Sequence, residues 1–133
     1  GILVKEIPAK VKKLSKLVGN TPLLELSIQI DGKKLKIYAK YEAWNYSGSI
    51  KDRMALQILQ SAYACKALEP ENTIIEATSG NTGIAFAAMG AFLGHSVEIF
   101  MPDWLSESTF CAFMGLNYMK LVLMMEVSYV VSS

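Results

Sequence analysis

The fold is decided by one stretch of the chain, residues 73–101, which reads TIIEATSGNTGIAFAAMGAFLGHSVEIFM. Residues 73–77 are a short apolar run typical of a buried strand, and residues 84–93 are the small and apolar residues of a helix that Gly94 would end. Residues 96–101 predict another strand, which Pro102 ends. Strands that alternate with helices at this spacing predict an α/β fold with right-handed crossovers.

Two more elements are predicted before this stretch. Alternating apolar residues over 35–41 predict a strand with one buried face, which we expect in the same three-layer parallel sheet. Apolar residues then recur at helical spacing from Met54 onward. Ser49 and Asp52 form the sequence pattern of a capping box, so this helix should begin near Lys51.

The composition allows one globular domain and argues against a nucleic-acid partner. The 133 residues are 52% hydrophobic, and their formal net charge is only +1. Nine of the 13 basic residues lie within residues 1–40, where four lysines could contact phosphate groups: Lys10, Lys12, Lys13 and Lys16. No arginine or aromatic side chain interleaves with them to read bases, which favours a solvated helix face. A lysine-rich binding module over residues 5–40 stays open as an alternative.

The cysteines and the chain start predict a cytoplasmic protein. Cys65 and Cys111 match no metal-ligand spacing and are too few for a disulfide scaffold, so we expect two buried or half-buried thiols and no metal site. Residues 1–6 lack the pattern of a signal peptide. Residues 110–131 are strongly apolar, but three polar residues favour a protein with no membrane span: Asn117, Lys120 and Glu126.

Lys51 is the first candidate for chemistry. It lies in the opening turn of its predicted helix, where the positive end of the helix dipole disfavours a cation. This placement suggests a poorly solvated amine that is able to attack an aldehyde. An ordinary surface lysine is the interpretation that the spacing alone favours.

The loop from Thr78 to Gly83 is the second candidate. It combines hydroxyl, amide and backbone N–H groups with two glycines at the start of a helix, an arrangement that binds carboxylate or phosphate groups. Ordinary capping of the helix by Ser79, Asn81 or Thr82 explains the same residues equally well.

Two single residues complete the candidates. We expect His95, the only histidine, to be a solvated loop residue, because it follows a glycine that ends a helix. Arg53 is expected to form a structural ion pair with Asp52 or with an acid elsewhere.

Four segments resemble, in order and spacing, signatures of the cysteine synthase and cystathionine β-synthase family. They are GNTPL at 19–23, NYSGSIKDR at 45–53, EATSGNTGI at 76–84 and MPDWLS at 101–106. The resemblance covers residues 18–107 and implies the amino-terminal part of a fold-type II enzyme that uses pyridoxal 5′-phosphate. Tyr46 stands where the family commonly has proline.

The resemblance also implies residue roles. Lys51 would be the Schiff-base lysine and the base that removes the substrate α-proton, and Asn81 would hydrogen-bond the ring oxygen of the cofactor. The substrate carboxylate would be held by Thr78, Ser79, Gly80, Asn81 and Thr82. The implied reaction is β-replacement on O-acetylserine, a small amino-acid substrate, with sulfide to give cysteine, in an enzyme that is a homodimer at full length. Cystathionine β-synthase-type β-replacement stays open, as does a truncated and inactive chain.

The chain departs from the family in length and in its last residues. Family members are more than twice as long, so the contacts to the cofactor phosphate and ring nitrogen are unassigned here. We expect residues 1–108 to form the amino-terminal part of the enzyme and residues 109–133 to be a divergent tail. Moving the reading frame back by one base over this tail restores glycine and aspartate codons like the family's, so we hypothesise an out-of-frame tail, which the coding DNA would test.

Overall fold

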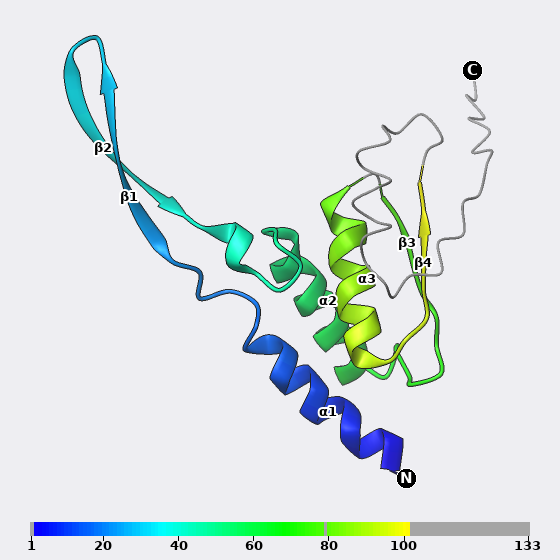
Figure 1. The fold of residues 1–133 in the computed structure, drawn as a ribbon. Coiled ribbons are helices and arrows are strands. Elements are labelled where there is room, and N and C mark those ends of the chain that lie inside the picture. Colours follow the sequence, from blue (N-terminus) through cyan, green and yellow to red (C-terminus); the bar gives the residue numbers. More distant parts are fainter. Residues whose placement is uncertain (1, 79, 102–133) are drawn as a thin grey trace, which may run out of the picture.

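The computed structural model describes residues 2–78 and 80–101, arranged as helices beside two small sheets (Figure 1). The elements follow in this order: α1 (Ile2–Ser15), β1 (Leu23–Ile30), β2 (Lys33–Lys40), the short 3₁₀ helix η1 (Glu42–Trp44), α2 (Lys51–Ala64), β3 (Ile74–Ala77), α3 (Asn81–Leu93) and β4 (Val97–Phe100).

Strands β3 and β4 pair in parallel, with α3 as the crossover between them. Their register runs from Ile74 opposite Val97 to Ala77 opposite Phe100. The Thr78 N–H donates to the Phe100 carbonyl oxygen at 3.0 Å, which extends the pairing by one residue. Gly94 ends α3 with a left-handed backbone (φ 90°). The predicted α/β class, the parallel pairing and the Gly94 helix end are confirmed.

Helix α3 lies between the parallel strands and the other two helices. Helix α3 contacts both strands on one side and contacts α1 and α2 on the other. This explains why its sequence is apolar on nearly every face: it is the middle of the stack. The main core cluster joins the three helices through Leu14, Ala55, Leu59, Ala85, Phe86, Met89 and Leu93.

The strand expected over 35–41 exists, but its predicted surroundings are wrong. Strand β2 pairs antiparallel with β1 in a hairpin that projects from the helices, so it is not part of the parallel sheet (Figure 1). Leu35 and Ile37 are 47% and 44% exposed rather than buried. The turn is Asp31-Gly32 with positive φ at both residues (50° and 77°), the geometry of a two-residue hairpin loop. Alternating apolar and polar residues predict that a segment is a strand, but they do not show whether another element covers its apolar face.

Strand β3 also departs from its prediction as a fully buried strand. Its residues alternate between half-buried and exposed, and Ile75 is 62% exposed. Only the face toward α3 is covered by described residues, because Ile74 packs against both core clusters. Strand β4 is the better buried of the two, with Val97 and Ile99 in the core.

Helix α2 begins at Lys51 as predicted, but not through the predicted capping box. The Ser49 hydroxyl accepts from the Lys51 N–H at 3.1 Å instead of from the Asp52 N–H, which a capping box requires. The Asp52 carboxylate reaches back past Ser49 and accepts from the Ser47 N–H at 2.6 Å. The Ser47 hydroxyl donates to the same carboxylate, and this second bond holds it there.

Two predictions about single residues are wrong. His95 is buried rather than solvated: its Nδ1–H donates to the Asn72 carbonyl at 2.8 Å, which leaves Nε2 to accept from the Tyr63 hydroxyl. This pairing joins the connection between α3 and β4 to the end of α2. Cys65 is exposed at the end of α2 rather than buried.

The lysines of residues 10–13 lie on α1, and Lys12 and Lys13 are exposed, in agreement with a solvated helix face. No helix among the described residues is long and apolar enough to span a membrane. The apolar run 110–131, Cys111 and the boundary expected at residue 108 lie outside the described residues.

Candidate functional site

Lys51 presents its side chain at the surface, at the first position of α2. The prediction of a poorly solvated amine is therefore wrong for this chain, because the preceding loop, residues 45–50, does not cover it. Its Nζ has no hydrogen bond or ion pair among the described residues. Within the described part of the chain, the amine is thus not held by a structural ion pair.

The loop that begins with Thr78 leads directly from β3 into α3. Gly80 is the N-cap residue, and the described residues form no side-chain cap bond at this helix start, so capping by Asn81 or Thr82 is not observed. The Gly80 carbonyl accepts from the N–H groups of Gly83 and Ile84, while Asn81 is exposed and Thr82 half-buried. The Gly83 N–H is thus already paired, and within the described residues only the N–H groups of Asn81 and Thr82 are left without an acceptor in the first turn of α3. Ser79 lies outside the described residues.

The two candidate segments share one end of the domain. Figure 1 shows that α2 and α3 both start toward the end at which β3 and β4 finish. The carboxyl ends of the two helices also lie together. Tyr63, near the end of α2, contacts His95, which follows the end of α3. The two helices therefore run side by side in the same direction. Ligands of parallel sheets bind beyond the carboxyl ends of the strands, where helices begin. Lys51 and the loop 78–82 lie at this end.

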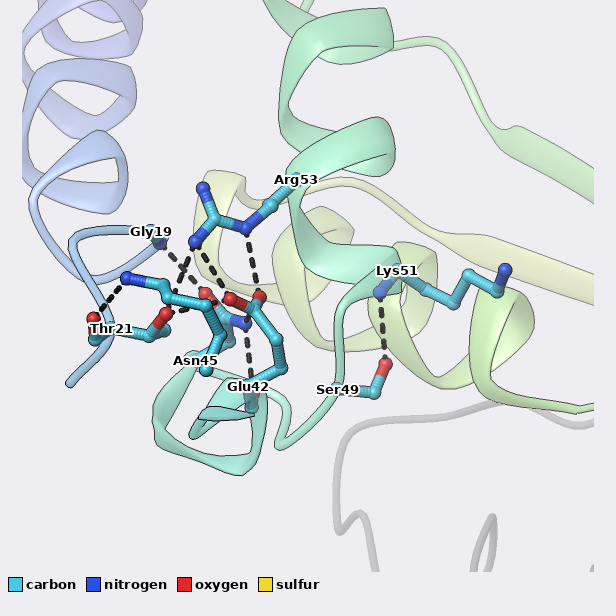
Figure 2. A network of polar contacts seen from close by, with 8 residues as sticks. Gly19, Thr21, Glu42, Asn45, Ser49, Lys51 and Arg53 are labelled. Atoms are coloured by element: carbon cyan, nitrogen blue, oxygen red, sulfur yellow. Dashed lines mark hydrogen bonds and ion pairs between the residues drawn. The ribbon is translucent and has the colours of Figure 1, made fainter. Parts of the chain in front are cut away.

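A network of polar contacts adjoins the start of α2 and was not predicted (Figure 2). Its centre is the Glu42 carboxylate, which accepts from Arg53 Nε at 2.8 Å and from Arg53 Nη2 at 2.9 Å. The Thr21 hydroxyl and the Asn45 amide donate to the same carboxylate at 2.6 and 2.8 Å. The expectation that Arg53 forms an ion pair is confirmed, and its partner is Glu42 rather than Asp52.

The network holds the Glu42 carboxylate ionised. The Arg53 guanidinium, with the Thr21 hydroxyl second, lowers the pKa of Glu42 from its ordinary 4.5 to about 2. Conversely, Glu42 raises the pKa of Arg53. Thr21, Asn45 and Arg53 fall within the motifs that carry the resemblance, whereas no pattern singles out Glu42, because its partners are distant in the sequence.

The described residues supply some of the groups that would bind an aldehyde cofactor and an amino-acid substrate. An unpaired, exposed amine suits bonding to an aldehyde, and uncapped helix amides suit a carboxylate. Among residues 2–78 and 80–101, no cluster of three or more potential metal ligands occurs. The described residues therefore fit a lysine-bound cofactor and offer no metal centre.

A protein-family model matches most of the chain. The family model described as "Pyridoxal-phosphate dependent enzyme" matches residues 14–118, which include Lys51 and the loop 78–83. The match covers more than half of the chain.

Curated relatives match over most of this chain. Cysteine synthase B of Escherichia coli is 39% identical over 94 residues, which are 71% of this chain and 31% of the relative. Cystathionine beta-synthase of Saccharomyces cerevisiae is 46% identical over 94 residues, which are 68% of this chain and 18% of that relative. The chain thus spans less than a third of the length of these proteins.

A solved structure shows the same fold. The hydrogen sulfide-producing enzyme of Fusobacterium nucleatum superposes with a TM-score of 0.77 at 48% sequence identity. The superposition covers 87% of this chain and 34% of the other. The described fold therefore corresponds to about a third of a larger enzyme.

Proposed function

The chain belongs to the family of pyridoxal-phosphate dependent enzymes, and on that premise we propose that it supplies the amino-terminal part of a β-replacement enzyme. The observation that carries the proposal is that the Lys51 amine and the start of α3 lie at one end of the domain and that neither has a side-chain partner among the described residues. The names of the relatives favour cysteine synthesis. The proposed reaction converts O-acetylserine and hydrogen sulfide to cysteine and acetate.

Lys51 would hold the cofactor through Nζ. When bound, the cofactor supplies an electron sink that stabilises negative charge at the substrate α-carbon. No side chain of this sequence supplies such a sink. Once released, the Lys51 amine would take the α-proton, a role that requires it to be neutral when the substrate arrives.

The loop 78–82 would bind and orient the substrate carboxylate. The amides at the start of α3 and the side chains of Thr78, Asn81 and Thr82 supply donors, and Gly80 lets the backbone approach closely. We assign Ser79 to the same role and Asn81 also to the cofactor ring oxygen, both on the resemblance. Holding the carboxylate would fix the direction of the bond to the α-proton, which accelerates its removal.

Cystathionine β-synthase-type chemistry is the second candidate. The relative of that name is the more identical of the two curated relatives described above. Both reactions use the same lysine and the same carboxylate loop and differ in the sulfur donor, sulfide or homocysteine. A homodimer, as the resemblance implies, and a cytoplasmic location, as the two cysteines predict, belong to the proposal in either case.

Trapping with borohydride tests the role of Lys51. The chain is mixed with pyridoxal 5′-phosphate and reduced, and the modified lysines are identified by peptide mapping. We expect faster labelling at Lys51 than at Lys66, an exposed lysine beyond the other end of α2. Lys51→Arg keeps the charge and should lose only this label. Equal labelling of both lysines would contradict the proposal.

A second measurement tests whether the chain only binds the cofactor or also reacts with the substrate. An absorbance band of the lysine-bound cofactor that changes when O-acetylserine is added would support turnover by the chain itself. A band that does not change when O-acetylserine is added would indicate that the lysine binds the cofactor without turnover of this substrate.

A further inference from the structure

The Glu42 carboxylate is saturated with donors. Each of its two oxygens accepts two hydrogen bonds: Oε1 from Thr21 and Arg53, and Oε2 from Asn45 and Arg53. Its side chain is 18% exposed, and the paired fork of Arg53 fixes the plane of the carboxylate. Charge-assisted pairs of this geometry are more directional than a lysine contact. Glu42 therefore acts as a rigid junction rather than as a solvated surface acid.

The junction joins three segments, one of which lies about twenty residues before the other two. Thr21 and Asn45 are both 4% exposed, and the Asn45 side chain also accepts from the Gly19 N–H at 2.7 Å. The Lys40 amine donates to the Thr21 carbonyl oxygen. The turn at 19–21, the loop after β2 and the first turn of α2 are thus tied to one carboxylate.

Arg53, the residue of α2 that binds Glu42, lies two residues from Lys51 in the first turn of the helix. Side chains at positions i and i+2 of a helix face different sides. Figure 2 shows this arrangement directly: Arg53 extends toward Glu42, and Lys51 extends away from it. The network fixes one side of the turn and leaves the amine on the other side unpaired.

The loop between Asn45 and Lys51 is held at two further points. The Asp52 carboxylate is fully buried and accepts from the Ser47 N–H and hydroxyl. The Tyr46 ring meets the ring of Phe92 on α3 edge-on, with centroids 5.8 Å apart. The loop that delivers Lys51 is therefore fastened to α2 and to α3.

We propose that Thr21, Glu42, Asn45 and Arg53 are positioning residues for the Lys51 amine. They hold the first turn of α2 at a fixed place relative to the start of α3, without touching cofactor or substrate. This inference rests on the proposed function of Lys51. It also gives three of the motif residues a defined task that is separate from ligand contact.

Conservative variants test the proposal in the full chain. Thr21→Val removes the hydroxyl with little change in shape, and Arg53→Lys keeps the charge but loses the fork. The measured quantity is the ratio of borohydride-trapped pyridoxal 5′-phosphate at Lys51 to that at Lys66. We expect both variants to lower this ratio by about tenfold, because small displacements of a reacting group cost large rate factors. Thr21→Ser, which restores the hydroxyl, should restore the ratio.

Tyr63→Phe is the matched control. It removes a hydrogen bond at the opposite end of α2 and should lower the denaturation midpoint without changing the labelling ratio. If Thr21→Val and Arg53→Lys behave like this control, the network is merely structural and the proposal is wrong.

Hydrogen exchange distinguishes failure of this inference from failure of the proposed function. If the wild-type chain labels Lys51 and Lys66 equally, the cofactor role of Lys51 fails. The hydrogen-exchange rates of the amides of residues 47–52 are then compared between the wild type and the variants. Faster exchange there in Thr21→Val but not in Tyr63→Phe would still support the positioning role, and unchanged exchange would overturn it.

Discussion

Gly90 of α3 lies directly against Val97 of β4: a β-carbon at position 90 would stand 2.4 Å from Cγ2 of Val97 and 3.2 Å from Cδ1 of Ile74. We therefore expect Gly90→Ala to destabilise the chain by about 1–3 kcal/mol, despite the better helix propensity of alanine, because this core has no room to give. Denaturant unfolding measures the loss. Adding Val97→Ala should recover part of it, whereas simple additivity of the two changes would contradict the close contact.

Acid should weaken the junction at Glu42. Because Arg53 lowers the Glu42 pKa from 4.5 to about 2, the folded state favours the ionised carboxylate. The stabilisation is complete above the ordinary pKa of 4.5 and is lost as the pH falls toward 2. Urea midpoints measured from pH 6 to pH 2.5 should fall more steeply for the wild type than for Glu42→Gln. Parallel curves would show that the ion pair does not contribute.

The Tyr63 and His95 pair should account for a measurable part of the stability. His95→Ala leaves the Tyr63 hydroxyl and the Asn72 carbonyl without their partner, so we expect a loss of about 1–3 kcal/mol. Tyr63→Phe should cost less, about 1 kcal/mol, because the ring stays in place. A double-mutant cycle checks the coupling between the two residues, and zero coupling energy would rule out the bond.

The buried Asp52 carboxylate should matter more than its neighbour Lys51 for folding. Asp52→Ala removes the acceptor of the Ser47 N–H and hydroxyl, and we expect a loss of about 1–3 kcal/mol. Lys51→Ala removes an exposed side chain with no described partner and should change stability by less than about 0.5 kcal/mol. Thermal unfolding of both variants measures the two losses of stability. Similar losses for Asp52→Ala and Lys51→Ala would contradict the assignment of a structural role to Asp52 alone.

The parts of the fold that the sequence predicts correctly are those set by local patterns. The end of α3 at Gly94 and the pairing of two strands around α3 follow from a glycine signal and from periodicity. The start of α2 at Lys51 follows from the polar residues Ser49 and Asp52, although they bond differently from the predicted capping box. The missed strand β1 also carried such a signal: Leu24, Leu26, Ile28 and Ile30 alternate with polar residues before the Asp31-Gly32 turn.

Tertiary features could not be predicted in the same way. The exposure of β2 depends on what covers a strand, and the burial of His95 depends on Tyr63, 32 residues away in the sequence. For the site, Lys51 and the loop 78–82 were found from residue types at helix starts. Glu42 was not, because its role arises only when Thr21 and Arg53 meet it in space.

The projecting hairpin has a practical consequence for every experiment above. Its two strands carry leucine and isoleucine side chains in water, and as a two-stranded ribbon it has outer edges that can template pairing with another molecule. Self-association will therefore compete with folding as the sample is concentrated. Sedimentation over a dilution series should come first, so that a shift assigned to a substitution is not an effect of protein concentration.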